Sequence, residues 1–100
     1  MSVPYYILDE NNEPVRCEDT AEWGRWFQTN DRKVADDLFG EITVSTIFLG
    51  VDYSGGGEKP QLFETMVFGG ELDGEQERYS THAEALAGHA AMVKRIKGEI

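Results

Sequence analysis

The sequence contains a single cysteine, Cys17, among its 100 residues. One cysteine excludes an internal disulfide, and the sequence has no Cys-x-x-Cys pair for a metal ion. A chain with this cysteine usage fits the reducing cytoplasm, where disulfides rarely persist. We therefore expect a cytoplasmic protein without disulfides, and no residue pattern indicates a cofactor.

Basic residues are also scarce. Nine lysines and arginines stand against 19 aspartates and glutamates, which gives a formal net charge of -10. Binding to a nucleic-acid backbone depends on clustered basic residues, so we expect no direct contact with nucleic acid. An acidic surface favours a basic partner, imitates the charge of a nucleic acid, or only keeps the protein in solution. Composition alone leaves these alternatives open.

Long hydrophobic runs are missing as well. A membrane-spanning helix needs about 18 or more apolar residues in succession, and no segment approaches that length. The first 14 residues, MSVPYYILDENNEP, lack a basic segment followed by an apolar run. The sequence therefore predicts neither a signal peptide nor a membrane protein.

The residues that are present predict one small folded domain spanning 1–100. Hydrophobic residues make up 40% of the chain and aromatic residues 11%, which is enough to build one core. Short β-like runs at 5–8 and 14–17 flank a polar turn. Asp19 is a candidate N-cap for a helix that should end near 29–31. Segment 32–38 is compatible with either a strand or a helix.

The second half of the chain has the clearer patterns. Segment 41–51 is rich in β-branched residues, and 61–69 is a second strong strand candidate beyond the glycine-rich loop 52–60. We expect these two strands to pair as antiparallel neighbours. A last short strand is expected at 77–80. Thr81 and Glu84 then have capping-box spacing before an apolar stripe of 3.6-residue period.

This order of elements predicts an α+β fold. We expect a single, mainly antiparallel sheet of four to six strands, with a short tryptophan-bearing helix and a C-terminal helix packed on it.

Glu64 is the most conspicuous candidate for chemistry, because it interrupts the apolar strand LFETMVFGG. The period of two places it on the same face as Leu62, Met66 and Phe68, so we expect that face to meet a helix. A buried carboxylate needs a partner, and Arg78 is among the candidates. We favour an ion-paired structural role over a catalytic or binding role.

Histidines and acids provide the remaining candidates for chemistry. His89 lies on the apolar stripe of the last helix, where a core histidine bonded to a backbone carbonyl is the common arrangement. His82 is two helical turns away, about 10 Å along the axis, so the two histidines cannot share a metal ion. A site that combines His89 with Glu64 or Asp52 stays open as a minor alternative. We therefore predict no metal site and assign no catalytic residue.

The aromatic residues of EWGRWF share one helix face at i, i+3 and i+4 spacing. Such residues more often fill a core than bind a ligand, although they could leave an apolar patch for a protein partner. The full set of candidate binding residues is Trp23, Trp26, Asp52, Tyr53, Glu64, Arg78 and His89.

Several stretches resemble a family of small uncharacterised proteins of tailed phages and prophages. They are EWGRWF, VSTIFLGVDYSGGG, LFETMVFGGELDGE and RYSTHAEALAGH, and the resemblance covers about residues 9 to 97. The LFETM-FGG block is its most specific part. The resemblance implies a phage or prophage origin, and it carries no catalytic residues over to this chain.

Two functional hypotheses follow. The first is a non-catalytic interaction protein that binds a host or phage protein through its acidic surface or its tryptophan helix. The second is a small ligand-binding protein or enzyme that uses Glu64, Asp52, Arg78 and His89. No nucleophile–base pair and no metal-ligand spacing supports the second hypothesis, so we prefer the first.

Overall fold

The computed structural model describes residues 5–54 and 57–99. Eight elements follow one another within these residues. The first half contains β1 (Tyr6–Leu8), β2 (Pro14–Arg16), α1 (Thr20–Thr29) and β3 (Lys33–Phe39). The remaining elements are β4 (Ile42–Phe48), β5 (Phe63–Phe68), β6 (Gln76–Tyr79) and α2 (His82–Glu99). The α+β class is thus confirmed, and segment 32–38 is resolved in favour of a strand.

The strands form two antiparallel sheets. The larger sheet has the order β3-β4-β5-β6, so each strand lies beside its neighbour in sequence. The predicted pairing of β4 with β5 is confirmed, with Thr46 opposite Thr65 and Phe48 opposite Phe63. The two strands β1 and β2 form a separate small sheet instead of extending the large one.

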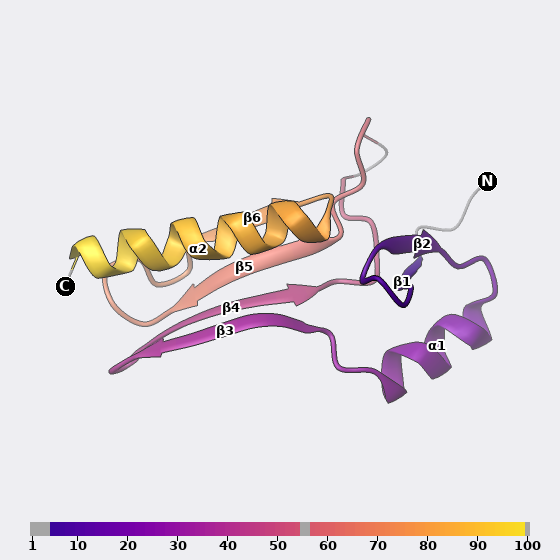
Figure 1. Ribbon diagram of the computed structural model, residues 1–100, viewed down its shortest axis with the longest axis horizontal. Coiled ribbons are helices and arrows are strands. Elements are labelled where there is room, and N and C mark those ends of the chain that lie inside the picture. The colour runs from indigo at the N-terminus through magenta and orange to yellow at the C-terminus, as the bar shows by residue number, and fades with distance from the viewer. Residues whose placement is uncertain (1–4, 55–56, 100) are drawn as a thin grey trace.

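The helix α2 lies along one face of the large sheet and contacts all four strands (Figure 1). Its first turn has the predicted capping box, in which Thr81 Oγ1 accepts from Glu84 N at 3.1 Å and Glu84 Oε1 accepts from Thr81 N at 3.1 Å. The Thr81 hydroxyl also donates to Glu84 Oε1 at 3.2 Å, and this bond, followed by the bonds from the backbone N–H groups of Thr81 and Ser80, holds the pKa of Glu84 below its ordinary value. The cap fixes where α2 begins on the sheet.

Two apolar clusters fill the space between α2 and the sheet. One is built on Val44, Val67, Met92 and Ile96. The other is built on Phe48, Leu62, Phe63 and Ala85. The first cluster combines alternate residues of β4 and β5 with one stripe of α2, as the two periodicities require. The second cluster includes Leu62, just before β5, and also packs against β1 and Trp26.

The expected environment of Glu64 is corrected by this packing. Phe63, Thr65 and Val67 face α2 and are fully buried, whereas Glu64 and Met66 point to the opposite face. The prediction that the Glu64 face meets a helix is therefore wrong. Along a single strand, alternation shows which residues share a face but does not show which face the helix covers.

The β1–β2 hairpin and α1 form the other end of an elongated molecule, which measures 45 × 29 × 21 Å (Figure 1). Asp19 caps α1 as predicted, since its side chain accepts hydrogen bonds from the backbone N–H groups of Ala21 and Glu22. The helix α1 packs mainly against β1 and lies beyond the end of the large sheet, not on its face. Trp26 connects the two ends through an edge-to-face contact with Phe48.

Candidate functional site

Glu64, Arg78 and Tyr53 form a side-chain cluster on the sheet face opposite α2. Glu64 and Arg78 are direct cross-strand neighbours on β5 and β6. Arg78 Nε donates to Glu64 Oε2 at 2.9 Å, and the two side chains are 33% and 13% exposed. The Arg78 guanidinium also lies 5.0 Å from the ring centroid of Tyr53, within range of a cation–π contact. The carboxylate is thus held by an arginine, as its structural interpretation requires.

Asp52 organises the base of the loop that joins β4 to β5. Its Oδ1 accepts backbone hydrogen bonds from Ser54 at 2.8 Å and from Gln61 at 3.0 Å, which ties the two ends of the loop together. Burial raises the pKa of Asp52, but the bonds from Ser54 and Gln61 outweigh burial and hold it below the ordinary value of 3.8. Asp52 therefore acts as an ionised acceptor for the loop backbone. The glycines at 55 and 56 lie outside the described residues.

His89 stands in a chain of side-chain hydrogen bonds beneath α2. Its Nε2 lies 2.7 Å from Asp37 Oδ2, and its Nδ1 lies 2.7 Å from Thr46 Oγ1. Thr46 Oγ1 is in turn 2.5 Å from Thr65 Oγ1. For a neutral imidazole whose Nε2–H donates to the Asp37 carboxylate, Nδ1 accepts from Thr46. In this tautomer each threonine hydroxyl donates toward the histidine.

This polar chain separates the two apolar clusters of the core. On β4, Thr46 stands between Val44 and Phe48, and on α2, His89 stands between the core positions Ala85 and Met92. A displacement of α2 by one turn would leave the buried threonines without their histidine partner. We therefore interpret the chain as the element that sets the register of the helix on the sheet.

The same arrangement does not suit nucleophilic catalysis. An acid, a histidine and a hydroxyl in line resemble the order of a catalytic triad. However, Thr46 and Thr65 are fully buried and His89 is only 5% exposed, so a substrate cannot reach the hydroxyl. The chain therefore acts inside the core.

The candidate chemical residues do not converge on one site. Thr65, which bonds into the His89 chain, faces α2, while its neighbour Glu64 faces the other way. The sheet therefore separates Glu64 and Arg78 from His89. Across residues 5–54 and 57–99, no group of three or more histidine, cysteine, aspartate or glutamate side chains is arranged to hold a metal ion.

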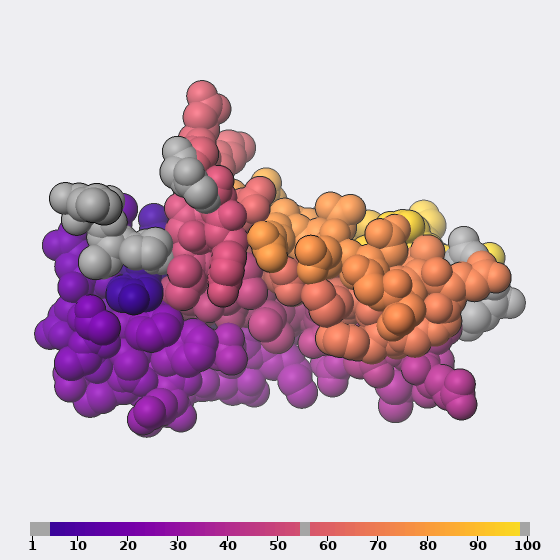
Figure 2. All heavy atoms as spheres, turned by 180° about the vertical axis from the view of Figure 1, so that it is seen from behind, coloured from indigo at the N-terminus to yellow at the C-terminus, as the bar shows by residue number. Residues whose placement is uncertain are grey.

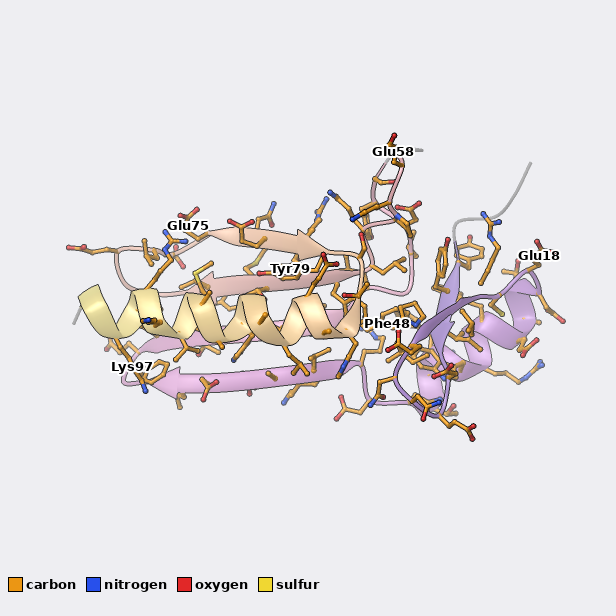
Figure 3. The ribbon with its side chains drawn as sticks, turned by 45° about the horizontal axis from the view of Figure 1, so that its top comes forward. Glu18, Phe48, Glu58, Glu75, Tyr79 and Lys97 are labelled. Atoms are coloured by element: carbon orange, nitrogen blue, oxygen red, sulfur yellow. The ribbon has the colours of Figure 1, made fainter. Side chains whose placement is uncertain are left out.

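Both tryptophans of α1 pack into the protein. Trp23 stacks on Tyr5 with ring centroids 4.5 Å apart, and its Nε1 donates to the backbone carbonyl of Gly50 at 3.0 Å. Trp26 contacts Phe48, whose place at the junction of the two ends is seen in Figure 3. The tryptophans thus join the N-terminal end to the sheet and are at least partly covered.

Sequence reasoning missed three members of the buried chain: Asp37, Thr46 and Thr65. It also expected a backbone carbonyl as the partner of His89, whereas both ring nitrogens bond to side chains. A usable signal was present, because a threonine replaces an apolar residue at the centre of the inward face of both β4 and β5. Two facing buried hydroxyls opposite a helix histidine predict a polar contact.

Comparison with known proteins provides no relative for this chain, since no family model, curated protein or solved structure matches it. Within the part of the chain that the structure describes, no helix is long and apolar enough to cross a membrane.

Proposed function

We propose that this chain is a non-catalytic interaction protein of phage or prophage type, which binds a host or phage protein in the cytoplasm through its acidic surface. The observation that carries the proposal is the placement of its charge. Every acidic side chain that the structure describes is exposed except those of Asp52 and Glu64, which are partly buried. With a formal charge of -10, this surface attracts a partner with a basic face.

The groups that an enzyme would use support the same proposal. Glu64 is paired with Arg78, and Asp52 is occupied by the loop backbone. His89 belongs to a buried chain on the other face of the sheet. The alternative, a ligand-binding protein or enzyme built on these four residues, is weaker because the sheet separates His89 from Glu64 and Arg78.

The phage or prophage origin rests on the resemblance of EWGRWF, VSTIFLGVDYSGGG, LFETMVFGGELDGE and RYSTHAEALAGH to that family, above all of LFETMVFGG. In the structure this block supplies β5 and the turn after it, with its alternate residues in the core. Because these residues belong to the core, the resemblance supports a shared fold but does not identify a binding partner. The acidic surface is therefore the part of the proposal that needs a direct test.

The test uses the intact protein as immobilised bait in a bacterial lysate, with elution by increasing salt and identification of the eluted proteins. Each candidate is then purified and its affinity measured by calorimetry. Attraction between exposed charges is screened by salt, so the affinity should fall steeply as ionic strength rises. A purified partner whose affinity is insensitive to salt would overturn the assignment to the acidic surface.

Two charge-neutralised variants divide this surface between the ends of the molecule. One replaces glutamates of the N-terminal end by glutamine: Glu10, Glu13, Glu18 and Glu22. The other replaces glutamates at or near the strand connections of the large sheet: Glu41, Glu71 and Glu77. All seven side chains are exposed, so both variants should fold. We expect one of them to weaken binding about tenfold or more, and unchanged affinity in both would contradict the proposal.

A further inference from the structure

The large sheet has one face that no helix of the described chain covers. The strand pairing places three rows of side chains on it. The first row is Leu38, Thr43 and Phe68. The second row is Asp36, Ser45, Met66 and Gln76. The third row is Lys33, Ile47, Glu64 and Arg78. Figure 2 shows the molecule from the side away from α2, where the strand segments reach the surface.

This uncovered face is apolar at one end and carries charge at the other. Leu38 is 71% exposed and Phe68 is 50% exposed, although both are large apolar side chains. Leu38 and Phe68 lie in one row on either side of Thr43, and Met66 in the next row is half-buried. Two large apolar side chains exposed in the same row of a sheet indicate a contact surface more strongly than scattered ones do.

The charges on this face are balanced, unlike those of the whole chain. Two basic residues stand beside two acidic ones, and they form two ion pairs. Lys33 Nζ lies 3.5 Å from Asp36 Oδ2, and Arg78 is paired with Glu64. In a protein of formal charge -10, a neutral face is where a second copy meets the least repulsion.

We propose that the uncovered face binds a second copy of this chain, sheet against sheet, in a two-fold symmetric dimer. A two-fold axis parallel to the strands and centred over β4 places β3 of one copy opposite β5 of the other. Leu38 then meets Phe68 of the second copy within the apolar row. In the charged row, Lys33 meets Glu64 of the second copy, and each contact occurs twice because the interface is isologous.

The size of the face determines the strength of this dimer. Three strands about 4.8 Å apart and six residues of about 3.4 Å along each give a flat footprint of about 300 Å² per copy. Standard interfaces bury about 800 Å² per partner, so the dimer is weak and reversible, not obligate. The two copies repel each other through their remaining negative charge, so added salt strengthens the dimer. Binding to a basic partner has the opposite dependence on salt, which separates this proposal from the proposed function.

The first experiment is sedimentation equilibrium of the intact protein over a range of concentrations at low and high salt. We expect the average mass to rise with concentration from 11.2 kDa toward twice that value, and to rise further at high salt. A protein that remains monomeric at high concentration and high salt would refute the dimer.

Matched variants locate the contact. Leu38→Ser removes an exposed leucine from the uncovered face, and Leu86→Ser removes a 46% exposed leucine from α2. We expect Leu38→Ser to raise the dissociation constant about tenfold or more and Leu86→Ser to leave it unchanged. Equal effects of the two variants would overturn the assignment. Thermal melts confirm that both variants are folded.

Cross-linking tests the orientation of the two copies. The axis over β4 places Ser45 of one copy opposite Ser45 of the other, at the roughly 10 Å separation of packed sheets. Ser45→Cys should therefore be joined by a short bismaleimide in a concentration-dependent reaction. Ala90→Cys, exposed on α2, should not be joined. Efficient cross-linking of Ala90→Cys alone would contradict the proposal. Loss of a lysate partner in Leu38→Ser, in a protein that stays monomeric, would assign the face to another protein and refute self-association.

Discussion

In the hydrogen-bonded chain of Thr65, Thr46 and His89, removing the central hydroxyl of Thr46 should destabilise the protein more than removing the terminal hydroxyl of Thr65. Thr46→Val keeps the shape of the side chain but deletes the hydroxyl that bonds to both His89 and Thr65. It leaves a buried ring nitrogen and a buried hydroxyl without their partner, each at a cost of about 1–3 kcal/mol. We expect a loss of about 2–4 kcal/mol in the free energy of unfolding.

The terminal substitution Thr65→Val provides the matched comparison. It removes one hydrogen bond while Thr46 continues to donate to His89, so the expected loss is about 1 kcal/mol. In the double variant, the second substitution also removes the Thr65 hydroxyl that the first one left without a partner. The double variant should therefore be at least about 1 kcal/mol more stable than Thr46→Val alone, with a coupling energy of about 2 kcal/mol or more.

Urea unfolding followed by circular dichroism measures these free energies, with equal m-values as the check that only stability has changed. For a domain of this size, 1 kcal/mol corresponds to about 4–8 °C in Tm, so thermal melts resolve the same differences. Losses that add within about 0.5 kcal/mol would show that the two hydroxyls act independently. A larger loss in Thr65→Val than in Thr46→Val would refute the central place of Thr46 in the chain.

Four further substitutions test other parts of the structure. Gly88→Ala places a methyl group against the β6 tyrosine ring and should cost about 1 kcal/mol or more, whereas Gly98→Ala meets open space and should be neutral or stabilising in thermal melts. Glu64→Gln should lower the unfolding free energy by about 1–2 kcal/mol in urea titrations. This loss is smaller than the roughly 3–5 kcal/mol of a fully buried pair because Arg78 reaches solvent. An unchanged unfolding free energy would mean that the Glu64–Arg78 pair contributes nothing to stability. Asp52 has a lowered pKa in the folded state, so its contribution to stability is present above about pH 4 and is lost as pH falls through that pKa. The difference in unfolding free energy between wild type and Asp52→Asn should therefore shrink between about pH 5 and pH 3. A difference that is constant with pH would exclude Asp52 as an ionised acceptor for the loop.

The elements of the fold were predictable because local signals specify them. The Thr81–Glu84 capping box indicated the start of α2, and the β-branched residues of 41–51 indicated a central strand that pairs with 61–69. The identity of the covered face was not predictable, since it depends on where α2 packs on the sheet. That packing is a long-range choice that the alternation within β5 leaves open.

The candidate site was predictable only in part, for a related reason. The pairing of Glu64 with Arg78 was among the expected contacts, because oppositely charged residues on neighbouring strands can face each other. The partners of His89 come from β3 and β4, up to 52 residues away in sequence, and Thr65 on β5 completes the chain through Thr46. Their meeting depends on the register of three strands and a helix, which no local pattern encodes.

The measurement that tests the central claim most directly is the affinity of a captured and purified partner at two salt concentrations, for wild type and for Glu64→Gln. Binding through the acidic surface predicts an affinity that falls with salt in both proteins and is nearly equal between them. A Glu64→Gln protein with an unchanged Tm that had lost the partner would contradict the account. That result would make Glu64 a binding residue instead of a structural one.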